Sequence, residues 1–540
     1  MVFYLQNKYY KNSMIRLLTS LVAVFTVTSL QAQSVVTVKE TPKLVIGITI
    51  DQLRGDYLEL FQHSFSEKGF KRLLGEGLVY ENMTFDFPNL DNASTIATIY
   101  TGTTPFYHGI VGDTKYLAKQ KRTVSTFADD NFLGNYTQEK VSPLALQVST
   151  IADELKRASH NSSDVYSLAP LSSQALIAGG HLANCAFWVD DQSGKWASST
   201  FYQNFYWVVD QENRSNTSYA ATSFGKYWNP LLDTKQYNAF PYSQGFINFQ
   251  HSLGMDTREA YKLFKKSPYV NECVRDMAVK IITKADMGKR VSPDFIGLNF
   301  YAGSFPGVGD YSAEIQDTYV RLDRDIETLL NEIDRTIGLK NTFIFLTSTG
   351  YYDDNEEPDL VLNRGTFHIN RCEALLNMYL MAIYGNSQWV EKFHNNQVYL
   401  NRKLIEDKKI SLKEIQQKSA EFIAEFTGVQ DVYTSYQLMH GEWNPIMEYY
   451  KNGYTKETAG DLFVEIQPGY KIANEQDAYF KTKVARHNAI VCPVIFFGNN
   501  IRPQRIKRTI KATEIAPTVS QVLRIRPPNA ATAQPLSELF

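Results

Sequence analysis

The sequence contains little cysteine, and the spacing of its cysteines does not predict a metal or redox motif. Four cysteines, Cys185, Cys273, Cys372 and Cys492, are widely scattered among 540 residues, with no C-x-x-C pair. No histidine lies beside them at zinc-ligand intervals. We therefore expect four buried thiols. An oxidising compartment would permit a disulfide, but the sequence does not specify a pairing.

Net charge is also nearly absent. Lys and Arg total 55 against 57 Asp and Glu, which gives a formal net charge of -2. There is no excess of basic residues that would attract nucleic acid, and there is no polyacidic tail. Charge thus argues against a nucleic-acid partner and identifies no other ligand or protein partner.

The amino-terminal segment has the pattern of an export signal. Lys8, Lys11 and Arg16 precede an apolar run at 17–30, and Ala32 follows it. The run is short and poorly flanked for a membrane-spanning helix, and no cysteine follows it to carry a lipid. We predict a signal peptide at 1–32 and an exported protein, periplasmic, surface-bound or secreted, without a transmembrane segment after cleavage. A membrane anchor remains the alternative.

The rest of the chain has the composition of a large folded protein, with 44% hydrophobic and 13% aromatic residues. Short apolar runs predict fully buried strands of a mostly parallel sheet. These runs are residues 44–50, 165–168, 295–300, 342–346 and 493–497. Helical patterns lie between them, most clearly at 318–334, where apolar residues recur at helical spacing. The fold class is therefore α/β, with a mostly parallel central sheet flanked by helices.

Two stretches fit this sheet poorly. Residues of about 198–292 and 359–481 are rich in Tyr, Asn and polar helix patterns, such as the one at 411–426. We predict one domain over 33–540 with inserted caps at these two places. No internal repeat or low-complexity tract is present.

Three motifs lie where ligands bind in such sheets, just past the carboxyl ends of strands. Residues 48–54 place Asp51 at the end of a buried run, residues 87–102 open a helix around Asn92, and residues 108–113 end in Asp113. Together these motifs resemble the alkaline phosphatase superfamily, and most closely the PafA-type alkaline phosphatases, which are relatives of the nucleotide pyrophosphatase/phosphodiesterases. The likeness continues through residues 180–188, 317–323, 398–405 and 513–520.

The resemblance implies an alkaline-phosphatase-like fold and a specific chemistry. The family hydrolyses phosphate esters with two zinc ions, which are held by Asp and His side chains at strand ends and activate a Thr or Ser nucleophile. Two zinc ions close together need roughly six protein ligands between them.

Carried over residue by residue, the family pattern matches this sequence poorly. The nucleophile position falls on Asn92, and Asp51 is the one zinc ligand that is retained. The other ligand positions fall on residues that hold zinc weakly or not at all: Ala302, Pro306, Thr349, Gly350 and Val491. The auxiliary phosphate-binding positions fall on Asp113, Leu171 and Ser173.

These replacements predict a degenerate site without catalytic residues or bound zinc. A carboxamide has no ionisable oxygen with which to attack phosphorus. Structural zinc sites contribute on the order of 10–16 kcal/mol because several ligands act together, and one carboxylate does not approach that. Loss of cationic residues and gain of Asp113 also make the pocket neutral or negative, which disfavours phosphate.

Ordinary structural roles compete with functional ones at these positions. Asp51 would serve as a strand-end carboxylate that accepts N–H bonds from the next helix. Asn92 would cap a helix over 93–100, or else form part of a residual anion site. We expect His108 and His181 to be structural.

Displaced metal ligands are the alternative. Asp353, Asp354, Glu356 and Glu357 are expected to form a solvated loop, because carboxylates without histidine favour calcium or magnesium over zinc. His440 suggests no specific ligand position. His487 lies four residues before Val491, and a register shift would bring it toward the vacant ligand position.

Three functions follow from the sequence. The first is a non-catalytic phosphatase relative with a binding or scaffold role. The second is a metal-dependent phosphomonoesterase or phosphodiesterase with a rearranged site that uses Asp51, Asp113 and the acidic segment. The third is a structural subunit of an envelope assembly, which predicts an exposed apolar patch. The ligand, the partner and the oligomeric state are not specified by the sequence.

Overall fold

The computed structural model describes residues 40–203, 205–216, 218–222, 226–238, 248–253, 260–309, 312–352, 365–476, 482–485 and 490–540. Contacts within the chain group residues 41–540 into one compact unit, and the predicted signal peptide lies outside the described residues. None of the described helices is long and apolar enough to cross a membrane.

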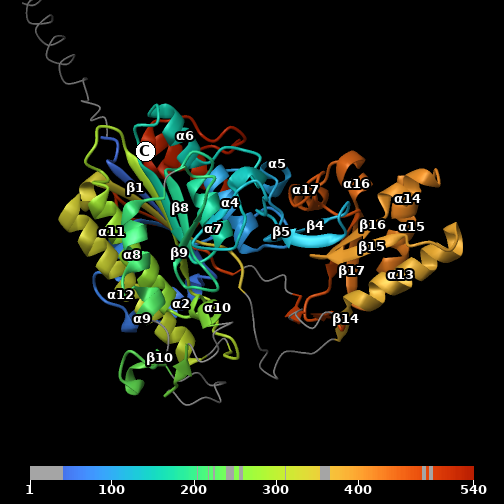
Figure 1. The fold of residues 1–540 in the computed structure, drawn as a ribbon, viewed down its shortest axis with the longest axis horizontal. Helices are drawn as coiled ribbons and strands as arrows, with labels where there is room; N and C mark the ends of the chain where they lie inside the picture. Colours follow the sequence, from blue (N-terminus) through green and yellow to red (C-terminus); the bar gives the residue numbers. More distant parts are fainter. Residues whose placement is uncertain are drawn as a thin grey trace, which may run out of the picture. The chain divides into compact units, whose positions relative to one another are not determined.

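A central sheet organises the described chain (Figure 1). Its order is β22 (Gln504–Ile506), β2 (Leu78–Tyr80), β21 (Val494–Gly498), β13 (Thr342–Ser348), β1 (Leu44–Asp51), β12 (Asp294–Tyr301), β7 (Val165–Ala169), β8 (Cys185–Val189), β9 (Trp196–Ser199) and β6 (Gly134–Asn135). The five strands from β13 to β8 are parallel to their neighbours within that group. This confirms the predicted α/β fold with a mostly parallel sheet.

Helices cover both faces of this sheet, which explains its almost uninterrupted apolar strands. One face carries α4 (Asn92–Thr101), α6 (Ile151–Ala158), α7 (Ser172–Gly179) and α18 (Ile515–Leu523). The other carries α3 (Phe70–Glu76), α8 (Trp207–Arg214), α11 (Tyr269–Lys284) and α12 (Ala313–Thr336). All eight residues of β1 and all eight of β12 are buried.

One predicted strand runs in the opposite direction. The run at 493–497 forms β21, but β21 pairs antiparallel with both β13 and β2. An apolar run indicates that a strand is buried but not whether it is parallel to its neighbours. The sequence therefore predicted this strand but not its antiparallel orientation.

A second, smaller core lies within residues 365–476. Its four-stranded antiparallel sheet has the order β15 (Val390–His394), β16 (Gln397–Leu400), β18 (Leu462–Ile466) and β17 (Val429–Thr434). Helices α13 (Ile369–Tyr384) and α15 (Leu412–Ala424) pack together against this sheet. Helices α14 (Arg402–Asp407), α16 (Ser435–His440) and α17 (Pro445–Asn452) complete this part of the chain. The boundaries predicted for the two caps remain predictions.

Short elements connect these parts. They are α2 (Gly55–Leu60), α5 (Pro105–His108), α9 (Tyr219–Thr222), α10 (Ala260–Phe264), the paired β3 (Met83–Thr84) and β23 (Ile510–Lys511), β4 (Thr114–Leu117) and β5 (Arg122–Ser125), β10 (Tyr227–Trp228) and β11 (His251–Ser252), and β14 (Thr366–His368) with β19 (Lys471–Ala473) and β20 (Lys483–Val484).

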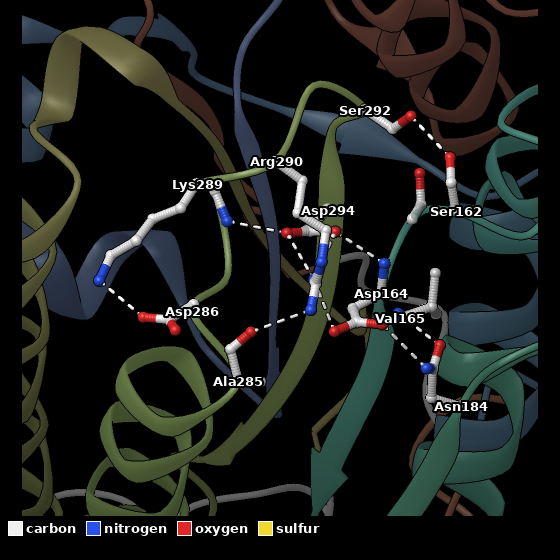
Figure 2. Close-up of polar contacts among 12 residues, drawn as sticks. Ser162, Asp164, Val165, Asn184, Ala285, Asp286, Lys289, Arg290, Ser292 and Asp294 are labelled. Atoms are coloured by element: carbon white, nitrogen blue, oxygen red, sulfur yellow. Dashed lines mark hydrogen bonds and ion pairs between the residues drawn. The ribbon is translucent and has the colours of Figure 1, made fainter.

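A polar network joins the amino ends of β7 and β12 (Figure 2). The fully buried Asp294 accepts N–H bonds from Asp164 at 2.6 Å and from Gly288 at 2.8 Å. Arg290 pairs with Asp164 at 2.6 Å and with Asp294 at 3.3 Å. Burial raises the pKa of Asp294, although these N–H bonds and the Arg290 charge oppose the shift. The network thus fixes the edge of the sheet opposite to the carboxyl ends.

Close packing of α4 on the sheet positions the start of that helix. A side chain at Gly47 would meet the Tyr100 hydroxyl at 2.8 Å and the Phe345 ring at 2.5 Å. Tyr100 donates a hydrogen bond of 3.3 Å to the Gly47 carbonyl. Glycine in β1 therefore lets α4 approach closely, and Asn92 begins that helix at the carboxyl edge of the sheet.

Candidate functional site

Asp51 is held by a residue from the neighbouring strand. It ends β1 and is 5% exposed, and the Thr349 hydroxyl, just past β13, donates a 3.0 Å hydrogen bond to its carboxylate. The Thr349 oxygen in turn accepts the Gln52 N–H at 2.9 Å. We call Asp51, Gln52 and Thr349 the Asp51 group. The family pattern placed former ligand positions at both Asp51 and Thr349, and the structure brings these two side chains into contact.

The loop after β12 brings Ala302 against the same strand end. The Ala302 N–H donates to the Asp51 carbonyl at 2.9 Å, and its methyl group is fully buried. Pro306 is partly buried four residues later. Both positions were predicted from the family pattern to be former ligands, and neither side chain carries a donor atom for a metal.

Gly350 has little room for a side chain. Its backbone is left-handed, with φ of 78°. A Cβ atom there would lie 2.3 Å from the Phe85 ring, which packs edge-on against Phe87. Any larger residue at this position would strain the backbone and displace Phe85.

Val491 lies beside the start of α2. Its carbonyl accepts the Gly55 N–H at 2.7 Å, four residues after Asp51 in the sequence. The Val491 side chain is 44% exposed. The site therefore has a solvent-accessible apolar group at this predicted ligand position.

Asn92, Asp113 and Ser173 come together from three elements. The Ser173 hydroxyl lies 3.0 Å from an Asp113 carboxylate oxygen and 3.5 Å from the side-chain amide oxygen of Asn92. Asn92 is 5% exposed and Ser173 is 8% exposed. Leu171 immediately precedes α7, and its N–H donates to Gln174 at 3.2 Å. We call Asp91, Asn92, Asp113 and Ser173 the Asp113 group. Asp91 is included because its carboxylate accepts hydrogen bonds from Asp113 and from Ser94, in the helix that Asn92 begins.

The expected helix cap was wrong by one residue. Asp91, not Asn92, caps α4: its carboxylate accepts the Ser94 N–H and hydroxyl at 2.8 and 2.7 Å. Its second oxygen accepts the Asp113 N–H at 2.8 Å. Asn92 is the first residue of the helix itself. Asp and Asn rank equally as caps, and Ser94 and Thr95 lie three residues after Asp91 and Asn92 respectively, so the sequence gave no preference between the two.

Two histidines have structural contacts, as predicted. His108 is fully buried between Thr98, at 3.1 Å from one ring nitrogen, and the Ile110 N–H, at 3.1 Å from the other. Burial lowers the pKa of His108 to about 3, so the ring is neutral. The Ile110 N–H must be accepted by an unprotonated nitrogen, which assigns the hydrogen to the nitrogen facing Thr98.

His181 has the opposite environment. Its ring nitrogens lie 2.9 Å from the Asp153 carboxylate and 3.0 Å from the Leu146 carbonyl, and two acceptors favour the charged ring. Burial opposes its protonation, but the hydrogen bond and charge of Asp153 outweigh burial, and the pKa of His181 is raised. The same pairing lowers the pKa of Asp153 against the effect of its own burial.

The smaller sheet supplies residues that sequence reasoning missed. His394, at the end of β15, lies 3.2 Å from the Thr114 hydroxyl, directly after Asp113. The Asn395 amide donates to the Thr114 carbonyl at 3.4 Å. No local motif marks these two residues as neighbours of Asp113. His394 is 280 residues from Thr114 in the sequence, and the fold alone brings the two together.

Among the described residues, no group of three or more His, Cys, Asp or Glu side chains has the arrangement of a metal site. The acidic residues Asp353, Asp354, Glu356 and Glu357 and the candidate His487 lie outside the described part of the chain. His440 ends α16 and packs against Tyr436, with ring centroids 4.8 Å apart. The four cysteines are free and buried, which confirms that prediction.

Comparison with known proteins identifies the relatives of this chain. Residues 45–488 match the family model described as type I phosphodiesterase / nucleotide pyrophosphatase. Among curated proteins, the chain is 27% identical to "Alkaline phosphatase PafA" of Elizabethkingia meningoseptica, covering 92% of this chain and 94% of the relative. It is 28% identical to "Alkaline phosphatase PhoV" of Synechococcus elongatus, with 92% and 93% covered.

A third curated relative has a different name. A Myroides odoratus protein called "Calcium-transporting ATPase" is 29% identical, covering 92% of this chain and 95% of the relative. Among solved structures, wild-type alkaline phosphatase PafA superposes with a TM-score of 0.80 at 27% identity, over 93% of this chain and 99% of that one. The shared architecture thus extends over nearly the whole chain.

Proposed function

Because the chain belongs to the type I phosphodiesterase / nucleotide pyrophosphatase family and is a PafA-type member of the alkaline phosphatase superfamily, we propose that it is an exported, catalytically silent member. In this proposal the strand-end site binds a ligand without hydrolysing it. The observation that carries the proposal is the hydrogen bond from Thr349 to Asp51.

This hydrogen bond supports the loss of zinc at Asp51. The carboxylate that the family pattern assigns to zinc is used by a hydroxyl donor, and the same hydroxyl accepts the Gln52 N–H. A zinc ion at Asp51 would share the carboxylate with that hydroxyl donor and would find Ala302 beside it instead of a ligand. The described residues of this site do not fit a pair of zinc ions.

The nucleophile position supports the same conclusion. Asn92 is buried at the start of α4, next to Ser173 and Asp113. Its carboxamide cannot form a phosphoryl ester. Ser173 offers a hydroxyl, but that hydroxyl donates to the Asp113 carboxylate, and the described surroundings include no histidine shown to act as its base.

Charge in the Asp113 group favours a ligand other than phosphate. Two carboxylates, of Asp91 and Asp113, lie around the amino end of α4, and each is held by hydrogen bonds. A carboxylate close to a phosphate group is repulsive, and burial strengthens the repulsion. We therefore propose a neutral or cationic ligand group for this side of the site.

A hydrolase with a rearranged site is the competing function, and the names of the relatives favour it. Both PafA and PhoV are called alkaline phosphatases. In that case Asp51 and Asp113 would act with ligands from the acidic segment at 353–357. Such a site would use a metal that accepts oxygen ligands, magnesium or calcium, more readily than zinc.

One experiment separates the two functions. Metal content of the purified protein would be measured by mass spectrometry, and hydrolysis of p-nitrophenyl phosphate and bis-p-nitrophenyl phosphate would be followed with added zinc, magnesium, calcium or manganese. We expect substoichiometric metal and no turnover above buffer. Stoichiometric metal with turnover that Asp51→Asn abolishes would overturn the proposal.

A matched variant controls for a missing nucleophile. Asn92→Thr restores a hydroxyl at the position that the family uses, without restoring any metal ligand. If this variant remains inactive with every metal, the defect lies in the metal site as well as in Asn92. If it gains metal-dependent turnover, a functional metal site exists and the proposal fails.

Export is the remaining part of the proposal. It rests on the pattern of Lys8, Lys11 and Arg16 before the apolar run at 17–30. Expression in a Gram-negative host, cell fractionation and amino-terminal sequencing would test it. We expect cleavage after Ala32 and recovery outside the cytoplasm; an intact amino terminus in the cytoplasmic fraction would contradict export.

A further inference from the structure

The turn between β15 and β16 contacts the segment that carries Asp113. Asn395 and Asn396 are the two residues between these strands. His394, the last residue of β15, lies 3.2 Å from the Thr114 hydroxyl, and the Asn395 amide donates to the Thr114 carbonyl at 3.4 Å. We call residues 394–396 the β15–β16 turn.

The same turn contacts the segment that carries Asp91. The side-chain amide of Asn396 donates to the side-chain oxygen of Asn89 at 3.1 Å, two residues before Asp91. Asp91 in turn accepts the Asp113 N–H at 2.8 Å, so the two segments are also joined to each other. The β15–β16 turn therefore bridges, from the smaller core, the two segments that supply the carboxylates of the Asp113 group.

Gly112 lets the turn come close to these carboxylates. A Cβ atom at Gly112 would lie 3.0 Å from an Asp91 carboxylate oxygen and 3.1 Å from the Asn395 amide nitrogen. Both distances are shorter than an ordinary van der Waals contact. The Asn395 amide and the Asp91 carboxylate are thus neighbours of the same backbone position, directly before Asp113.

The residue type at the second position of the turn favours this contact over the ease of the turn itself. Asn395 and Asn396 both have left-handed backbones, with φ of 48° and 57°. Two left-handed residues in a two-residue hairpin loop are typical of a type I′ turn, in which glycine is preferred at the second position. Asparagine tolerates this conformation less well than glycine, but it supplies the amide that binds Asn89.

From these contacts we propose that the β15–β16 turn is a positioning element through which the smaller core sets the spacing of Asp91 and Asp113. The inference rests on the proposed function only in taking the Asp113 group as part of the ligand site. The turn acts through Asn89 and Thr114, on either side of the Asp91–Asp113 hydrogen bond. A ligand that contacts both carboxylates would therefore bind to a pair whose spacing depends on the smaller core.

A nearby aromatic contact keeps the two parts together when the polar contacts of the turn are removed. Tyr116 of β4 packs edge to face on Tyr399 of β16, with ring centroids 5.0 Å apart, and both side chains are buried. Single substitutions in the turn should therefore loosen the Asp113 group locally without detaching β4 from the smaller sheet.

Hydrogen–deuterium exchange of the purified full-length protein tests the proposal. The Asp113 amide is the reporter, because its hydrogen bond to Asp91 must open before it exchanges. Asn396→Gly keeps the backbone of the turn and removes the contact with Asn89, and Thr114→Val removes the hydroxyl that His394 contacts. We expect each variant to speed Asp113 exchange roughly twofold to tenfold, the effect of one hydrogen bond. Amides of β12 should exchange as in the unaltered protein.

Two further variants separate positioning from a general structural role. Asn89→Asp gives the Asn396 amide a charged acceptor and should slow Asp113 exchange, whereas in the Asn396→Gly background it should have no effect. Glu457→Ala is the matched control, since it breaks another exposed contact of the smaller core, the 2.8 Å hydrogen bond from Gln147. It should leave Asp113 exchange unchanged.

Three results would overturn the proposal. They are unchanged Asp113 exchange in both Asn396→Gly and Thr114→Val, equal acceleration in Glu457→Ala, and equal acceleration of the β12 amides, which would indicate general destabilisation. No ligand or turnover enters this measurement. Metal-dependent turnover would therefore overturn the proposed function and leave the positioning result standing, and failure of the exchange test would leave the proposed function untouched.

Discussion

Thr349 donates its hydroxyl hydrogen to the Asp51 carboxylate at 3.0 Å, and so joins the ends of β13 and β1 at the site. The same oxygen accepts the backbone N–H of Gln52, and Gln52 has a left-handed backbone with φ of 62°. Thr349 thus supports both a buried carboxylate and a strained turn.

Replacing Thr349 with valine should destabilise the protein. The change preserves shape but leaves the buried Asp51 carboxylate without this donor and the Gln52 N–H without its acceptor. We expect a loss of about 1–3 kcal/mol in the free energy of unfolding. Urea denaturation measures it, and Thr349→Ser, which keeps the hydroxyl, should lose less than half as much. Equal losses for the two variants would mean that packing, not hydrogen bonding, matters here.

The α4 cap predicts a difference between two neighbouring residues. Asp91→Ala removes the acceptor for the Ser94 and Asp113 N–H groups and should cost about 2 kcal/mol of unfolding free energy. Asn92→Ala should cost less than about 1 kcal/mol, because alanine is favourable inside a helix. Thermal and urea denaturation of both variants would test this. A larger loss for Asn92→Ala would show that the amide of Asn92 has a stabilising role beyond the helix.

The Asp153–His181 pair predicts a specific pH dependence. The folded-state pKa of His181 is raised, so its stabilising effect is complete below its ordinary pKa of about 6.5 and is lost as pH rises through the raised value. The pKa of Asp153 is lowered, so its contribution is lost as pH falls below its ordinary range. The pair contributes most between these limits.

Urea denaturation between pH 5 and 9 measures this effect. His181→Gln should flatten the decline in stability above pH 6.5 relative to the unaltered protein, and the two curves should differ most near pH 6. His108 stays neutral in the folded protein because burial lowers its pKa to about 3, whereas the unfolded chain takes up a proton at this residue below pH of about 6.5. It therefore makes stability rise with pH between 5 and 6.5 in both proteins, and this shared slope cancels in their difference. Parallel curves for the two proteins would exclude an ionic bond between Asp153 and His181.

The network in Figure 2 predicts unequal effects for two ion pairs close to each other. Asp294→Ala leaves the buried Asp164 and Gly288 N–H groups without their acceptor, and Arg290 keeps only its contacts with Asp164 and the Ala285 carbonyl. We expect a loss of about 2–4 kcal/mol, less than for a fully enclosed pair because Arg290 is 40% exposed. Asp286→Ala breaks the exposed Lys289–Asp286 pair and should leave the unfolding midpoint unchanged. A similar loss from both variants would contradict this assignment.

Much of the central fold was predictable because both faces of its sheet are covered. Full burial makes β1, β7, β12 and β13 continuous apolar runs, which are easy to recognise. Strand direction was not predictable in the same way, and β21 proved antiparallel. The smaller sheet was missed, because β15 and β17 are only five and six residues long and their buried residues do not alternate strictly with exposed ones.

The site was predictable where it depends on strand ends. Asp51 and Thr349 meet because their strands are adjacent and parallel. Asn92, Asp113 and Ser173 also meet, as the family pattern implied. The contributions of His394 and Asn395 depend on how the smaller sheet folds against β4, and local spacing carries no information about that.

The left-handed turn at Gly350 restricts how a metal-binding side chain could be engineered into the site. A single substitution there would introduce a side chain into the space of the Phe85 ring and strain the backbone at once. An imidazole at this turn would therefore require a smaller residue in place of Phe85 as well as a change of the backbone conformation.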